Sequence, residues 1–213
     1  MIINHEHPLY RKRIAGAGLN AYNGAYYYSI EICKHFVPAV QTDRNWITIN
    51  IPGCGANHSI VFIHNNLHPE NYSWLKNYHD LILVCGIPET VLKMEHLGTA
   101  IYLPLSIDVA EVSQYIRPKT KGIAYVGRPA KRANVIFEAD TDFLEGLPRP
   151  KLLAAMAEYQ SVFAVGRTAL EAKVLGCEIL PYDERFPDTE RWQVLDSREA
   201  AKLLDEKIKL IDC

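Results

Sequence analysis

The chain lacks the sequence patterns of several common protein classes. Its five cysteines include no CxxC pair and no Cys/His quartet with zinc spacing, so neither a zinc finger nor a disulfide framework is indicated. No apolar run approaches the ~20 residues that a membrane helix needs. The first residues have no basic segment followed by an apolar one, as a signal peptide would. We therefore expect a cytoplasmic protein without a transmembrane segment, whose cysteines are reduced core residues.

Excess charge and the common catalytic motifs are also missing. The net charge is −2, with 23 basic and 25 acidic residues, so we expect no nucleic-acid partner. There is no P-loop, no G-x-S-x-G elbow and no full dinucleotide fingerprint. The histidines follow neither HExxH nor another recognised metal-binding spacing, so no metal site is predicted. Basic residues cluster at 11–13 and 128–132, either as phosphate ligands or as solvated surface.

The sequence does contain a regular alternation of short apolar runs with helical segments. Such a rhythm is typical of βαβ units around a parallel sheet. The expected strands are 46–51, 59–64, 80–85, 100–103, 122–126, 133–137, 161–165 and 178–181. The expected helices are 25–36, 69–78, 88–96, 148–158, 168–175 and 197–211. The sequence thus predicts an α/β protein made of two Rossmann-like halves with parallel sheets.

A polar stretch around 115–122, with Pro118 and Gly122, reads as a linker between these halves. We therefore expect an N-terminal half, 1–115, and a C-terminal half, 116–213. Both are near the lower end of the usual domain size, so they are expected to support one another.

The most informative segment runs from Phe163 to Leu180 and predicts a strand, a glycine turn, a helix, a glycine stop and a second strand. Gly166 allows close backbone approach to a ligand and places the amides of Arg167 and Thr168 at a helix N-terminus. Such a terminus suits a phosphate or another oxygen-rich group. Glu171, one turn further on, is able to accept hydrogen bonds from sugar hydroxyls, or is simply a polar helix residue.

This segment resembles the nucleotide-binding segment of GT-B glycosyltransferases, where a G-x-x-x-x-E-A-x-x-x-G-x-P-V-I pattern recurs. The resemblance implies that Glu171 bonds the ribose hydroxyls of a nucleotide sugar. Two positions depart from the pattern. Phe163 stands where retaining members often carry another glutamate, and Cys177 and Glu178 follow Gly176 where proline is usual.

A second segment, 122–132, is similar to the (V/F)-G-R-x-x-x-x-K segment that opens the nucleotide-binding half of these enzymes. The resemblance implies that Gly127 ends a strand and belongs to the nucleotide-sugar-binding residues, and that Arg128 and Lys131 contact the diphosphate. A departing nucleoside diphosphate gathers negative charge, which such cations offset. The alternative is an exposed basic loop.

The N-terminal half is less diagnostic. Gly16 and Gly18 resemble the glycine-rich loop of the acceptor half, which lies against the donor phosphates, although a plain flexible loop has the same composition. His64 ends an expected strand, and ligands of α/β sheets bind at the carboxyl ends of strands. It is either a general base for an acceptor hydroxyl or a buried structural histidine.

Together these segments favour a hexosyltransferase-type glycosyltransferase of the GT-B fold, with its site between the halves and its second half reduced. Its donor would be a nucleoside-diphosphate sugar, without a cofactor, and the acceptor is not indicated. Two alternatives stay open: a catalytically silent binding or scaffold protein of the same fold, and an epimerase-type sugar-nucleotide enzyme. An oligomer is compatible with the sequence.

Overall fold

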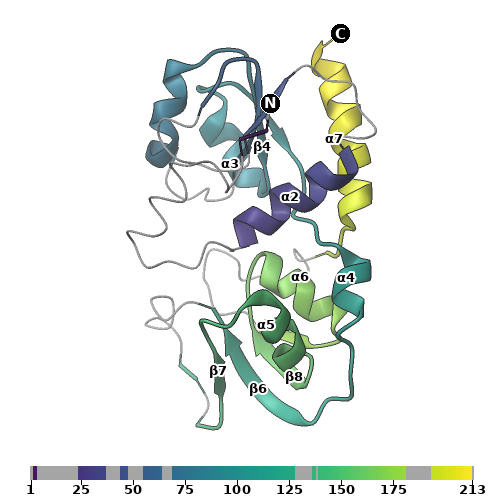
Figure 1. The fold of residues 1–213 in the computed structure, drawn as a ribbon. Helices are drawn as coiled ribbons and strands as arrows, with labels where there is room; N and C mark the ends of the chain where they lie inside the picture. The colour runs from purple at the N-terminus through teal and green to yellow at the C-terminus, as the bar shows by residue number, and fades with distance from the viewer. Residues whose placement is uncertain are drawn as a thin grey trace. The chain divides into compact units, whose positions relative to one another are not determined.

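The computed structural model describes residues 2–3, 24–36, 44–47, 55–63, 69–127, 136–137, 139–180 and 193–212. The chain divides into two compact units, each with its own parallel sheet and helices (Figure 1). Unit 1 comprises Met1–Leu105 together with Ser197–Cys213, and unit 2 comprises Ser106–Asp196. The α/β class and the two parallel sheets expected from the sequence are confirmed.

The sheet of unit 1 has five parallel strands that lie in the order of the chain. The two central strands, β3 and β4, are buried at every position. Their residues are almost all apolar, as strands covered on both faces must be. The five strands are β1 (Ile2–Ile3), β2 (Asn45–Ile47), β3 (Ser59–Ile63), β4 (Leu81–Cys85) and β5 (Thr99–Tyr102).

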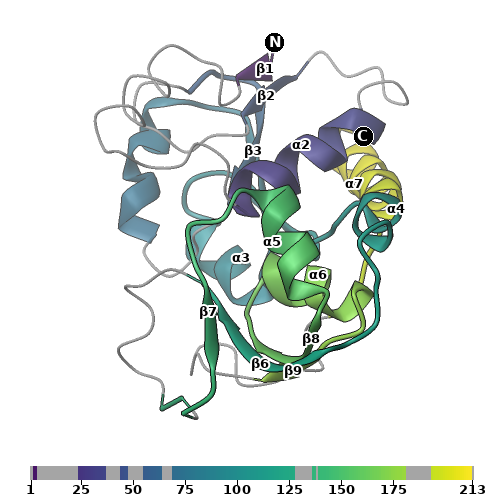
Figure 2. The same ribbon diagram turned by 60° about the horizontal axis from the view of Figure 1, so that its bottom comes forward.

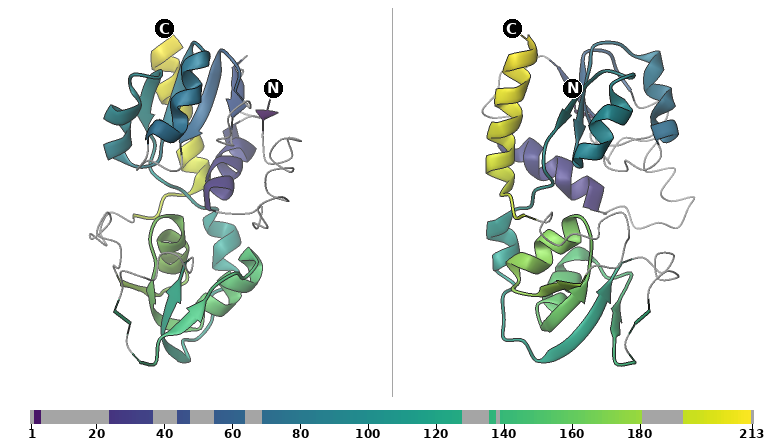
Figure 3. Two further views of the ribbon diagram at one scale, coloured as in Figure 1. Left: turned by 90° about the vertical axis from the view of Figure 1, so that its left-hand side faces the viewer. Right: turned by 180° about the vertical axis from the view of Figure 1, so that it is seen from behind.

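Helices cover both faces of this sheet (Figure 3). The 3-10 helix η1 (Pro69–Asn77) and α3 (Pro88–Met94) pack on one face, where Tyr72 joins Val61 and Leu83 in the core. On the other face Phe62 contacts the ring of Tyr28 from α2 (Gly24–Phe36). The C-terminal helix α7 (Ser197–Asp212) packs beside α2.

The sheet of unit 2 has four parallel strands in the order β7-β6-β8-β9. The helices α5 and α6, which follow β7 and β8, lie on the same side of it (Figure 2). A short helix, α4, precedes β6 and contacts α6. The elements are α4 (Val109–Ser113), β6 (Lys121–Val126), β7 (Asp142–Leu144), α5 (Arg149–Met156), β8 (Tyr159–Phe163), α6 (Arg167–Val174) and β9 (Glu178–Leu180).

Three details differ from the sequence-based expectations. The second strand of unit 2 is β7, at 142–144. Of the strand expected at 133–137, residues 133–135 lie outside the described residues, and 136–137 belong to no strand. The division between the units falls after Leu105 rather than at 115. The final helix belongs to unit 1 rather than to the second half, because α7 packs against α2.

None of the helices in the described part of the chain combines the length and the apolar character that crossing a membrane requires.

Candidate functional site

The strand order of unit 2 reverses between β6 and β8. From β6 the chain passes to β7 on one side and then returns to β8 on the other. Ligands of open α/β sheets bind outside the carboxyl ends of the strands at such a reversal. Tyr125 of β6 lies opposite Phe163 of β8, so Gly127 and Gly166 follow neighbouring strand ends. This carboxyl edge of unit 2 is the candidate site.

Gly166 shapes the backbone where β8 leads into α6. Its φ of 62° and ψ of −139° lie in a region that residues with a side chain rarely adopt. The residue caps α6 without a side-chain hydrogen bond, and its carbonyl accepts from the amides of Ala169 and Leu170. The amides of Arg167 and Thr168 therefore precede the first helical donor. An oxyanion is favoured at this end of a helix.

Gly127 has a packing reason to be glycine. A Cβ atom at this position would lie 2.7 Å from Cζ of Tyr125. The Tyr125 ring is fully buried, so it has no room to move aside. The glycine that the resemblance assigned to nucleotide-sugar binding is therefore also required by the packing of its own sheet.

Glu171 is held by two arginines. It is only 4% exposed, and its Oε1 accepts from Nε of Arg149 at 3.0 Å and from Nε of Arg167 at 3.2 Å. Arg149 also donates from Nη1 to Glu111 at 2.5 Å, while Arg167 donates to the carbonyl of Ser106 at 2.8 Å. The two cations and two carboxylates thus form a neutral network that joins α4, α5 and α6.

Arg149 is a residue of this site that the sequence analysis did not single out. It opens α5, just as Arg167 opens α6. A cation in the first turn of a helix is unfavourable because the helix dipole is positive there. Two arginines in first turns therefore indicate nearby negative charge, and Glu171 supplies it.

Phe163 belongs to a cluster of aromatic rings on the sheet. Pairing places Tyr125 beside both Phe143 and Phe163, on one face of three strands. The ring of Phe137 lies 5.2 Å from Tyr125, 5.2 Å from Phe143 and 5.3 Å from Phe163, in edge-to-face contacts. The position where retaining glycosyltransferases often carry a glutamate is thus part of an apolar cluster here.

The described ranges contain only some of the predicted site residues. Gly127, Gly166, Arg167, Thr168 and Glu171 lie together at the carboxyl edge of unit 2. The other predicted site residues, namely Gly16, Gly18, His64, Arg128 and Lys131, lie outside the described residues. Within the described ranges, no group of three or more metal-ligating side chains is positioned to hold a metal ion.

A comparison of this chain with protein-family models, with curated proteins and with solved structures gives no match.

Proposed function

We propose that the protein is a glycosyltransferase of the GT-B type that binds a nucleoside-diphosphate sugar at the carboxyl edge of the β7-β6-β8-β9 sheet. The observation that carries the proposal is the reversal of strand order between β6 and β8, directly beside the Gly166 turn that opens α6. This combination of a sheet reversal and an open helix N-terminus suits a diphosphate.

The proposal gives each residue a distinct role. The backbone amides of Arg167 and Thr168, after the Gly166 turn, would bind the phosphate oxygens. Arg128 and Lys131, which follow β6 in the chain, would offset the charge of the leaving diphosphate. Glu171 would contribute to nucleotide binding from the start of α6, as the resemblance implies. His64 is the candidate base for the acceptor hydroxyl.

Thermal-shift measurement with UDP, GDP, ADP and their sugars tests the proposal. A true ligand at a hundredfold excess over its dissociation constant should add ~2.7 kcal/mol to the stability of the folded protein. Because mass action requires only binding, this readout does not depend on knowing the acceptor. If no nucleotide or nucleotide sugar raises the melting temperature at millimolar levels, the proposed function is wrong.

Variants then separate binding from chemistry. Arg128→Ala and Lys131→Ala should lower turnover more than affinity, because these cations act on charge that develops in the transition state. Glu171→Ala should lower affinity with little change in kcat, because it removes contacts present in both states. Lys151→Ala is the matched control, since Lys151 is an exposed residue on α5. Equal behaviour of all four variants would contradict the assignment.

A second candidate function is a catalytically silent binding protein of the same fold. It is favoured by the burial of Glu171 between two arginines and by the aromatic environment of Phe163. The two functions differ in one measurement. A silent module binds a nucleotide but does not hydrolyse or transfer the sugar when the donor is supplied with mixed acceptors, whereas an enzyme releases the nucleoside diphosphate.

A further inference from the structure

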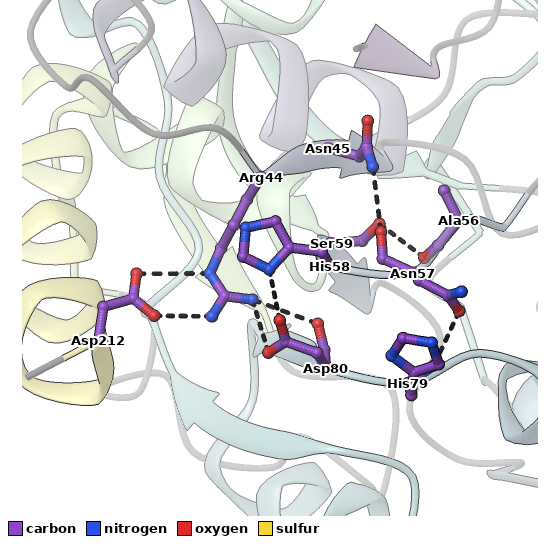
Figure 4. Close-up of polar contacts among 9 residues, drawn as sticks. All are labelled: Arg44, Asn45, Ala56, Asn57, His58, Ser59, His79, Asp80 and Asp212. Atoms are coloured by element: carbon purple, nitrogen blue, oxygen red, sulfur yellow. Dashed lines mark hydrogen bonds and ion pairs between the residues drawn. The ribbon is translucent and has the colours of Figure 1, made fainter.

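Arg44 joins two distant parts of unit 1. Its guanidinium donates from Nη1 to the carboxylate of Asp80 at 3.0 Å and to the Asp80 carbonyl at 3.2 Å. The same guanidinium donates from Nη2 and Nε to the carboxylate of Asp212, at 2.6 and 3.4 Å (Figure 4). Arg44 is 6% exposed, so these pairs are shielded on the arginine side. The last residue of α7 is thereby tied to the sheet.

Asp80 pairs with His58 as well as with Arg44. Arg44, His58 and Asp80 each directly precede a strand, β2, β3 and β4, so they lie at the amino edge of the sheet. The ring of His58 is hydrogen-bonded through Nδ1 to the Asp80 carboxylate (Figure 4). Both residues have positive φ, 53° at His58 and 54° at Asp80, which is uncommon for residues other than glycine. Their backbone conformation is therefore held by its surroundings.

In the described part of the chain, the end of α7 beyond Ile208 has no buried residue, and Ile211 is half-buried. Ile208 is the last fully buried residue of the helix, and Leu210 is 81% exposed. Lys209 pairs with Asp205 on α7 itself at 2.6 Å, without reaching the sheet. The acidic and basic groups on the helix that packs against α7 are Glu31, Lys34 and His35 of α2, and Glu31 accepts from Ser197 at the opposite end of α7. Among the described residues, the contact of Asp212 with Arg44 is thus the polar contact that joins the final turn to the sheet.

Two hydrogen bonds between uncharged groups, here called the neutral brace, lie beside these ion pairs. The side chain of Asn45 donates to the Asn57 carbonyl at 3.0 Å, and the Asn57 side chain accepts from the amide of His79 at 3.0 Å. These hydrogen bonds do not titrate, so they keep the strand starts together when the charges change (Figure 4).

We propose that the chain Asp212–Arg44–Asp80–His58 is an ionic latch that holds the final turn of α7 to the sheet of unit 1 and opens in acid or high salt. Opening frees the turn beyond Ile208, while the packing of α2 on α7 and the neutral brace stay in place. The hydrogen bonds from His58 and then from Arg44 hold the pKa of Asp80 below its usual range. A lowered pKa means that the stabilisation is present above about pH 4 and is lost as the pH falls below it.

Hydrogen–deuterium exchange of the peptide that covers 205–212 tests the latch in the full chain. Protection factors, corrected for intrinsic exchange, should fall roughly tenfold in acid below about pH 4 or in about 1 M NaCl, because acid protonates Asp80 and salt screens the ion pairs. Asp212→Asn should show the same low protection at neutral pH, with no further loss in acid. Arg44→Met should show the same low protection if this variant folds. If it does not fold, the result with Asp212→Asn alone decides whether the latch exists.

Lys209→Met is the matched control. It removes a charge pair from the same turn of α7 but leaves Arg44, Asp80 and Asp212 intact. Its protection, salt dependence and acid dependence should equal those of the parent protein. If Asp212→Asn also equals the parent, or if the parent's final turn keeps its protection in acid and in salt, the latch does not exist.

Discussion

Among single residues, Glu171 is one whose substitution should cost stability, because it pairs with two buried arginines. Glu171→Gln would leave Arg149 and Arg167 buried with a neutral partner, and breaking a buried ion pair from one side typically costs ~3–5 kcal/mol. Part of this cost is recovered because Arg149 keeps Glu111. We expect the free energy of unfolding in urea to fall by about 2–4 kcal/mol.

The matched control for this prediction is Glu178→Gln. Glu178 accepts from Ser161 at 2.8 Å in an exposed pair, so its substitution should change the unfolding free energy by less than about 1 kcal/mol. If the two variants are equally stable, Glu171 does not hold the arginines.

Cys85 gives a pH-dependent prediction at the alkaline end. Burial in β4 raises the pKa of its thiol to about 11. In the unfolded chain a thiol titrates near ~8.5, so folding opposes ionisation. The stabilisation is complete below that value and is lost as the pH rises towards 11. Urea unfolding of the parent should therefore become easier between these pH values, whereas Cys85→Ala should show a shallower pH dependence.

The local structure around Gly166 could be predicted from the sequence, but the ion pairs of the candidate site could not. The order of strand, glycine and helix around Gly166 is visible in the sequence because glycine and apolar periodicity are local signals. The contact of Glu171 with Arg149 spans 22 positions and depends on how α5 packs against α6. Such packing leaves only an indirect local signal, the cations in the two first turns.

At the scale of elements, the turn into α6 depends on Gly166. An alanine there must adopt φ near 62° with ψ near −139°, a strain of about 1–3 kcal/mol. Gly166→Ala should therefore lower the melting temperature and weaken any oxyanion binding at α6. Gly122→Ala is its control, since a Cβ at Gly122 in β6 meets nothing within 4 Å. Equal melting temperatures for the two variants would contradict the strained turn.

One lysine caps the C-terminal ends of two helices of unit 2. Lys119 donates from Nζ to the carbonyls of Ala157 and Leu175, at 2.9 and 2.7 Å, and these residues follow α5 and α6. It also lies 3.2 Å from the Cys177 sulfur. A cation is favourable at helix C-termini, so Lys119→Met should cost about 1–3 kcal/mol of unfolding free energy. Lys173→Met, on α6 itself, is the comparison, and an equal loss would mean that capping is unimportant.

The elements that sequence reasoning missed are all short and lack an apolar pattern of their own. β3, β4, α6 and α7 carry enough apolar periodicity to be recognised. The missed elements, β1, α4 and β7, contain two to five residues and show no period. β7 exists because β6 pairs with it, a non-local cause, and the 3-10 geometry of η1 is likewise not encoded in its helical pattern.

At the scale of the whole molecule, the two units are built differently along the chain. Unit 2 is continuous, so a fragment of residues 106–196 has all its elements and should unfold cooperatively by itself in urea. A fragment of residues 1–105 lacks α7 and leaves the α2 face uncovered, so we expect it to be unstable. Adding a peptide of residues 197–213 should restore its helical circular dichroism signal. A cooperative transition of 1–105 without the peptide would contradict the prediction.

The discontinuity of unit 1 also bears on how the protein is made. On the ribosome, α2 and its sheet emerge early, but the helix that packs beside α2 emerges only after all of unit 2 has been synthesised. The nascent chain must therefore carry an exposed apolar surface on α2 through the synthesis of residues 106–196. Unit 2 is thus expected to finish folding first, although it comes second in the sequence, and unit 1 finishes folding only after α7 has been synthesised.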